Sequence, residues 1–179
     1  MRTSGWFATV VLAVSIQGGD MTKAHKTAMT RKAPSRPMLR LATDNRIVGN
    51  ALDYGCGKGF DADTYGMEKY DPHFAPDMPA VSFETITCNF VLNVIESDIE
   101  KARVLTDIRG RLLNSGTAYI TVRNDKRALR GTTSKGTYQC HVVLKLPVVY
   151  SCSGYVTYEL KASDRTDTSI LESRTYDAA

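Results

Sequence analysis

The sequence predicts an α/β domain built on a mostly parallel β-sheet. Short apolar runs that suit strands alternate with helical patterns, a glycine-rich turn follows the first of these runs, and two β-rich runs lie close together near the end. A chain of 179 residues is long enough for one ordinary domain and short for two. We therefore expect a single domain over residues 21–162.

The first half of the chain carries one helix signal and three strand signals. Ser-Arg-Pro at 35–37 is typical of a helix start, and apolar residues between 38 and 42 give that helix one buried face. A brief buried strand is predicted over 50–54, ending at the glycines. A second strand is predicted over 66–70, and a third, rich in β-branched residues, over 84–90 (ETITCNF).

A second helix is predicted over residues 97–114. Ser97 and Glu100 have the spacing of a capping box at its start. Asn114, Ser115 and Gly116 are expected to end it. Its predicted buried face consists of Ile99, Ala102, Leu105, Ile108 and Leu112.

The remaining segments complete the predicted sheet. A strand is expected over 117–124, and the runs LPVVYSCS and GYVTYEL, which meet at Gly154, predict a closing antiparallel pair. Residues 163–179 have little apolar content and are predicted to be a disordered tail. Residues 1–20 are predicted to be a leader or a disordered extension; their apolar run is too short to span a bilayer, and an export signal or a packed element are the alternatives.

Composition excludes some classes of site. The cysteines form no C-x-x-C pair and the histidines are scattered, so we expect no metal site, free thiols and a cytoplasmic location. The net charge of +4 is only mildly basic. Basic residues concentrate in segments 23–40 and 123–135, which predict contacts with nucleic acid or, alternatively, solvated flexible segments.

The glycine-rich turn has the pattern D-x-G-x-G-x-G, formed by Asp53, Gly55, Gly57 and Gly59. Alternate glycines after a strand let the backbone turn sharply and approach a ligand closely. A dinucleotide-binding turn has its third glycine one position later, where this chain has Phe60. The spacing therefore favours S-adenosylmethionine, which has no pyrophosphate, over NAD, with a purely structural turn as the alternative.

An acidic residue also follows the second predicted strand. The paired oxygens of Asp71 suit the two hydroxyls of a ribose. Asp71-Pro72 is equally typical of an ordinary turn, but the nearby glycine turn favours the cofactor interpretation.

LDYGCGKG and Asp71 resemble motif I and the second-strand acid of class I S-adenosylmethionine-dependent methyltransferases. The blocks KTAMTRKAPSRP, KYDPHFAPD, CNFVLNVIE and GTTSKGTYQ are similar to small methyltransferase-like proteins of phages and of bacterial DNA-phosphorothioation loci. The resemblance covers roughly residues 24–160. It implies a Rossmann-like sheet of seven strands.

The resemblance also implies roles for individual residues. It places Asp53, Gly55, Gly57 and Gly59 around the methionine part of the cofactor and Asp71 on its ribose. Asn89, at the end of the third predicted strand, corresponds to the position that bounds the methyl-donor pocket in this family.

The chain departs from the family pattern in two places. Only HFAPDMPAVSFE separates the second predicted strand from ETITCNF, so the usual third strand and its helix are expected to be shortened or missing. Phe74 and Asp77 are the candidates for stacking on the adenine and binding its amino group. The segment GFDADTYG after the glycines is also short, which predicts a clipped first crossover helix.

The methyl acceptor is not defined by a motif. The chain has neither a Pro-Pro pair at CNFV nor a Pro-Cys nucleophile, so we predict no catalytic residue. Asn93, Tyr138 and Gln139 are candidate acceptor contacts, with structural roles as the alternative. The predicted function is S-adenosylmethionine-dependent methyl transfer; the alternatives are a cofactor-binding module that acts with a partner protein and an NAD-dependent oxidoreductase.

Overall fold

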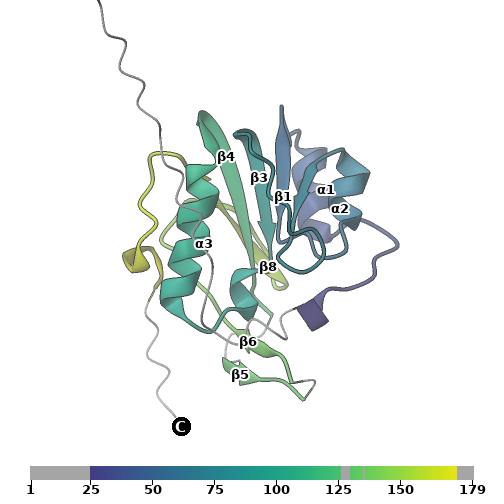
Figure 1. Ribbon diagram of the computed structural model, residues 1–179. Coiled ribbons are helices and arrows are strands. Elements are labelled where there is room, and N and C mark those ends of the chain that lie inside the picture. Colours follow the sequence, from purple (N-terminus) through teal and green to yellow (C-terminus); the bar gives the residue numbers. More distant parts are fainter. Residues whose placement is uncertain (1–24, 126–129, 135, 173–179) are drawn as a thin grey trace, which may run out of the picture.

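The computed structural model describes residues 25–125, 130–134 and 136–172, so the predicted leader lies outside the described residues. Six strands form one sheet in the order β2-β1-β3-β4-β8-β7 (Figure 1). These strands are β1 (Ala51–Tyr54), β2 (Glu68–Tyr70), β3 (Phe83–Asn89), β4 (Leu112–Arg123), β7 (Val148–Ser151) and β8 (Tyr155–Lys161).

The sheet is parallel from β2 to β4 and antiparallel from β4 to β7. A parallel pair needs a crossover connection, which the helix α2 (Phe60–Tyr65) supplies between β1 and β2 and the helix α3 (Asp98–Gly110) between β3 and β4. The closing antiparallel pair predicted around Gly154 is confirmed as β7 and β8.

The predicted loss of the third strand of the family sheet is also confirmed. After β2 the chain returns directly to β3 on the other side of β1, and no described strand pairs with the outer edge of β2. The sheet therefore has six strands where the resemblance implied seven. Met78, in the connection, packs against the core, and α2 spans only six residues, as the short segment after the glycines predicted.

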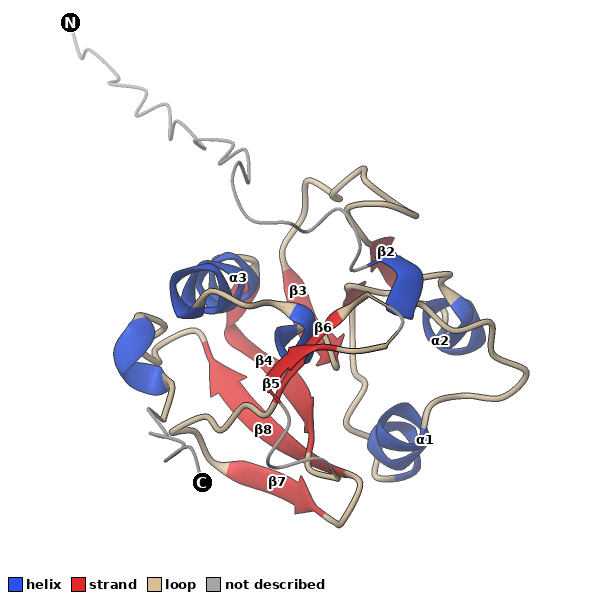
Figure 2. Ribbon diagram, turned by 90° about the horizontal axis from the view of Figure 1, so that it is seen from below, coloured by secondary structure: helices blue, strands red, loops and turns tan. Residues whose placement is uncertain are grey.

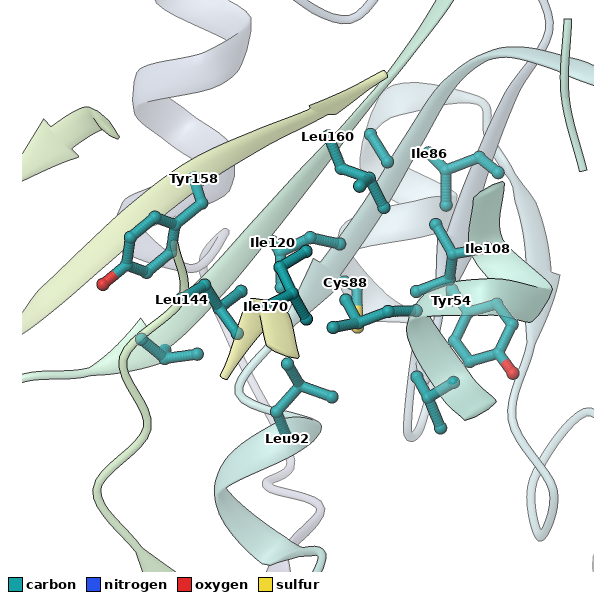
Figure 3. Packing of buried hydrophobic residues seen from close by; sticks show 14 of the residues in the cluster. Tyr54, Ile86, Cys88, Leu92, Ile108, Ile120, Leu144, Tyr158, Leu160 and Ile170 are labelled. Carbon is teal, nitrogen blue, oxygen red and sulfur yellow. The ribbon is translucent and has the colours of Figure 1, made fainter. Parts of the chain in front are cut away.

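Helices cover both faces of the sheet. The predicted first helix is α1 (Arg36–Thr43), which lies with α2 on one face, while α3 covers the other (Figure 2). Apolar side chains of β1, β3 and β4 alternate between these faces. Leu52 belongs to the core cluster on the α3 side, where Figure 3 shows Ile86 and Ile120 with Ile108 of α3. Ala51 and Tyr119 pack with α1 and α2 on the other face.

The helix predicted over 97–114 is shorter than expected. Its start is correct, because the hydroxyl of Ser97 accepts a hydrogen bond from Glu100 N (3.4 Å). Its helical residues end at Gly110. Ile99 was wrongly assigned to the buried face, since it is 59% exposed. Lys101 is buried instead, and its ammonium donates to Asp98 Oδ1 (2.7 Å).

The residues expected to stop this helix belong to β4. Leu112 pairs with Phe83, and regular pairing resumes only at Thr85 and Thr117, so the intervening residues form an irregularity in the strand. A Cβ at Gly116 would lie 2.7 Å from the carbonyl oxygen of Phe83. The glycine therefore permits close approach of the two strands, and pairing with β3 overrides the local signal for a helix end.

The prediction of a disordered tail from residue 163 is wrong for residues 163–172. The short helix η3 (Thr168–Ile170) ends at the core, where Ile170 and Leu171 are buried. Ile170 lies beside Leu144 in Figure 3, and Lys145 N donates to Ile170 O (2.7 Å). Two adjacent apolar residues are enough to anchor this otherwise polar segment.

Candidate functional site

The glycine turn lies at the carboxyl end of β1, as predicted. Gly55, Gly57 and Gly59 have φ values of 76°, 55° and 78°, the left-handed region that side chains other than glycine adopt only at a cost. A Cβ on Gly55 would lie 2.3 Å from the Cγ2 atom of Val91. The turn is fixed to the neighbouring strand because Gly55 N donates to Tyr70 O (2.7 Å).

Asp71 lies at the end of β2, directly beside this turn. Its Oδ2 atom accepts a hydrogen bond from Gly57 N (3.0 Å). Its Oδ1 atom accepts from His73 N (2.9 Å) and Phe74 N (3.0 Å). A carboxylate has about four acceptor positions, so Asp71 organises both loops and keeps one position for a further donor.

The glycine turn and the residues after β2 enclose an open pocket of about 290 Å³. The ring of Phe74, which is partly exposed, lines the pocket. Lys69 also lines it, and its ammonium forms a salt bridge with Asp63 (2.7 Å). Asp77 is exposed and does not line the pocket. The lining residues are Cys56, Gly57, Lys58, Gly59, Lys69, Phe74 and Ala75.

Asp53 is buried beneath the turn, with 4% of its surface exposed. The hydroxyl of Thr87, on the adjacent β3, donates to its Oδ1 atom (2.9 Å). Burial raises the pKa of Asp53 to about 7, and the negative charge of Asp61 adds to this, while Thr87 and the positive charge of Arg31 oppose it. The site thus contains a buried carboxyl group that titrates near neutrality.

Asn89 ends β3 at the same edge of the sheet. Both polar atoms of its amide are buried without a hydrogen-bond partner in the structure. The next residue, Phe90, has a φ of 64°, which is unusual for a bulky side chain. Orphaned amide atoms next to a strained backbone are typical of a ligand-binding position.

The three predicted acceptor contacts lie elsewhere. Asn93, in the short helix η2 (Leu92–Val94), is fully buried, donates to Cys140 O (2.8 Å) and accepts from Arg123 N (2.9 Å). Its role is therefore structural. Tyr138 and Gln139 are half-buried on β6 (Tyr138–Cys140), which pairs with β5 (Arg130–Thr132) in a separate two-stranded sheet. Neither residue lines the pocket.

Residues 25–35, here called the N-terminal strap, lie across the glycine turn. The sequence assigned them only to the basic segment 23–40, as a contact for nucleic acid, and named none of them as a cofactor-binding residue. Long-range contacts fix the strap, and no short-range pattern signals them. The ring of His25 stacks on His73 at 4.2 Å. Lys58 Nζ donates to Thr30 Oγ1 (2.6 Å), and Ser35 N donates to Asp61 Oδ1 (2.8 Å).

The two basic segments, 23–40 and 123–135, differ in how much of each the structure describes. Most of segment 23–40 is described and belongs to the strap and α1, but residues 126–129 and 135 of the second segment lie outside the described residues. Where the structure describes the chain, no group of acidic, His and Cys side chains is arranged to hold a metal ion. Within the same ranges, no helix has the length and apolar character needed to cross a membrane.

Solved methyltransferase structures are similar to this fold. The N-methyltransferase NodS from Bradyrhizobium japonicum WM9, in complex with S-adenosyl-L-homocysteine, has a TM-score of 0.50 at 12% identity, covering 79% of this chain and 98% of NodS. A methyltransferase from Bacteroides fragilis, also in complex with S-adenosyl-L-homocysteine, has a TM-score of 0.49 at 14% identity, covering 76% of this chain and 81% of its own.

DhpI in complex with S-adenosyl-L-homocysteine has a TM-score of 0.49 at 13% identity and covers 72% of this chain and 84% of its own. No protein-family model matches the chain, and no curated protein sequence matches it. The fold of this protein is the Rossmann-like methyltransferase fold, with the glycine turn at the carboxyl edge of its sheet.

Proposed function

We propose that this protein is an S-adenosylmethionine-dependent methyltransferase. The observation that carries the proposal is the buried carboxyl group of Asp53 beneath a left-handed glycine turn, with Asp71 at the end of the next strand. Ligands of open α/β sheets bind at the carboxyl ends of the strands. The likeness to NodS supports the fold on which this arrangement rests.

The residues of the site fit the parts of this cofactor. A buried carboxylate with a single hydroxyl donor is costly unless a cation joins it, and the ammonium of the methionyl group is such a cation. Asp71 keeps an acceptor position for one ribose hydroxyl. Phe74 offers its ring for stacking on adenine.

NAD fits the same site poorly. A dinucleotide requires a glycine where α2 begins, so that the helix N-terminus can approach the pyrophosphate. Phe60 occupies that position, and α2 is only six residues long. The oxidoreductase alternative therefore has less support than methyl transfer.

The cofactor would supply an electrophilic methyl group, which leaves the protein the task of positioning the acceptor. Asn89 has free amide atoms at the end of β3 for this purpose. A cysteine nucleophile is disfavoured, because Cys88 is fully buried and burial raises its pKa. Burial likewise raises the pKa of Cys56, in the glycine turn, to about 12.

Nucleic acid or a related phosphate-bearing metabolite is our proposed acceptor class. Lys58 and Lys69 line the pocket, and the strap adds further positive charge, which attracts polyanions. The resemblance to phage and DNA-phosphorothioation proteins agrees with this class of acceptor.

A cofactor-binding module without its own turnover is the second candidate. The open outer edge of β2 favours it, because no strand in the described part of the chain pairs with this edge. Such a module would bind the cofactor and complete its site with a partner protein.

Transfer of a labelled methyl group separates the two candidates. The full chain is incubated with methyl-labelled S-adenosylmethionine and a cell extract that is divided into nuclease-treated and protease-treated portions. We expect label in a fraction that nuclease removes. The Asp71→Asn variant should lose this label, because its side-chain amide nitrogen cannot accept the hydrogen bond that Gly57 N donates to Asp71 Oδ2. Binding of the cofactor without labelling of any fraction would support the module instead.

A further inference from the structure

The N-terminal strap and α1 carry the positive charge of the chain. The whole chain has 23 bases and 19 acids, and residues 25–43 contain five of the bases and no acid, so the remainder has 18 bases against 19 acids. The five bases are Lys26, Arg31, Lys32, Arg36 and Arg40. The positive net charge therefore comes entirely from this segment, which we call the basic surface.

Neighbouring acids do not neutralise the basic surface. Among the described residues, no salt bridge joins any of its five bases to an acid, whereas bases elsewhere pair with acids. Lys101 pairs with Asp98 (2.7 Å), for example, and Arg111 pairs with Asp107 (3.0 Å). Four of the five bases are exposed, and Arg31 is half-buried. A surface of this kind attracts anions.

Contacts with the rest of the domain fix the strap, and with it the bases that it carries. At one end the ring of His25 stacks on that of His73 (4.2 Å). At the other end Ser35 N donates a hydrogen bond to Asp61 Oδ1 (2.8 Å). The bases between these two anchors are therefore held against the domain.

The basic surface continues from the strap into α1 (Figure 1). The buried residues of α1 are Pro37, Met38 and Leu41. Arg36 and Arg40 are exposed and four positions apart, so they lie on the same side of the helix. Two like charges at this spacing destabilise a helix slightly. An anion bound to both would offset this cost.

The basic surface also reaches the pocket. Lys58 lines the pocket, and its ammonium donates to Thr30 Oγ1 of the strap (2.6 Å). The strap passes close to the glycine turn, because a Cβ on Gly57 would lie 3.2 Å from the Cβ of Ala28. A polyanion bound along the strap would therefore pass beside the pocket.

We propose that the basic surface binds the phosphodiester backbone of a nucleic acid and holds it beside the pocket. The inference rests on the proposed function for the role of the pocket, and it names the surface that would hold a nucleic-acid acceptor. Backbone binding needs several bases that displace counterions from the phosphates, and it needs no base-specific groups. Five bases that follow one another along an acid-free segment meet this need.

Two variants with the same net charge test the proposal. The surface variant combines Lys26→Ala, Lys32→Ala and Arg36→Ala, which replace exposed bases that do not line the pocket. The control variant combines Arg103→Ala, Lys145→Ala and Arg165→Ala, which replace exposed bases outside the basic surface. Arg31 is kept, because its half-buried side chain could affect the fold of the strap.

Binding is measured by fluorescence anisotropy on the full chain over a series of salt concentrations. The labelled probes are a single strand of DNA, the same DNA as a duplex, and a single strand of RNA, which distinguish the sources of the phosphodiester backbone. Unlabelled polyglutamate serves as a competitor that carries negative charge without phosphates. Each protein is also titrated with S-adenosylhomocysteine by calorimetry.

We expect the original protein to bind nucleic acid with an affinity that falls as salt rises. For the surface variant, the slope of log binding constant against log salt concentration should be shallower by about two to three, since each lost phosphate contact contributes about 0.7–0.9. The control variant should keep the original slope. Both variants should bind S-adenosylhomocysteine as the original protein does, which also shows that they are folded.

Four results would overturn the proposal. Equal losses in the two variants would show that binding follows net charge alone. An unchanged slope in the surface variant would place the binding surface elsewhere. Displacement by polyglutamate as effective as that by unlabelled nucleic acid would indicate an acidic protein as the partner. If the original protein binds S-adenosylhomocysteine but no nucleic acid, this proposal fails while the cofactor assignment stands; failure to bind either would contradict the proposed function as well.

Discussion

At the scale of single residues, Asp53 combines deep burial with ionisable chemistry. Its carboxyl group lies on the face of β1 that α1 and α2 cover, and Thr87 is its hydrogen-bond donor. Without a ligand, burial favours the neutral form and raises the pKa to about 7. A buried aspartate at position 53 therefore reduces the stability of the fold at neutral pH. Such a cost is expected at a binding site rather than in a core.

The first prediction concerns stability and pH. Between the ordinary pKa of 3.8 and the folded value of about 7, the folded chain holds a proton on Asp53 that the unfolded chain releases. Raising the pH across this window therefore favours unfolding. We expect the melting temperature of the ligand-free protein to fall between about pH 4 and about pH 7. Over the same range, the melting temperature of the Asp53→Asn variant should fall less. Parallel curves for the two proteins would contradict this account.

The second prediction concerns the glycine turn. Gly55→Ala combines a left-handed φ with a contact of 2.3 Å to Val91, and strain and overpacking together should cost about 2–5 kcal/mol. Gly66 has a similar φ of 64° with nothing within 4 Å, so Gly66→Ala should cost only about 1 kcal/mol. Urea unfolding of both variants checks the difference. Equal losses would show that Val91 yields freely.

The sequence predicted the part of the site that a local pattern encodes. Asp53, the glycines and Asp71 stand within 19 positions, and the structure brings them to one edge of the sheet. Asn93 was misassigned because an amide gives no sign of whether its partners are backbone atoms or a ligand. Arg31 was assigned only to a basic segment, because its place over the turn depends on contacts distant in sequence.

At the scale of elements, the boundaries depend on tertiary pairing more than on local signals. The start of α3 follows from its cap, but its end follows from Leu112 pairing with Phe83 in β3. The C-terminal segment follows from two apolar side chains that reach the core. Sequence patterns predicted the strands of the main sheet in their chain order but not the separate pair β5 and β6, while tertiary pairings set the ends.

The third prediction concerns this C-terminal segment. Ile170→Ala should destabilise the protein by about 2–5 kcal/mol, because it removes a buried side chain that packs with Leu144. Thr168→Ala, an exposed change in the same short helix, should have little effect. Thermal or urea unfolding compares the two. If Ile170→Ala is as stable as Thr168→Ala, the segment is not part of the core.

At the scale of the whole molecule, the described residues keep the strands that form the site, and none of them forms a strand outside β2. β1, β2 and β3 provide Asp53, Asp71 and Asn89 at one edge. The connection after β2 contributes Phe74 to the pocket and Met78 to the core. The missing strand therefore leaves the methionine end of the proposed site intact and changes mainly the surroundings of the adenine end.

The most direct test of the central claim is calorimetric titration of the full chain with S-adenosylhomocysteine and NAD. We predict that S-adenosylhomocysteine binds and NAD does not. Asp71→Asn should weaken binding, and Asp77→Asn, an exposed acid outside the pocket, should leave it unchanged. Binding of NAD in preference, or an affinity for S-adenosylhomocysteine that is indifferent to Asp71, would contradict the assignment of this site.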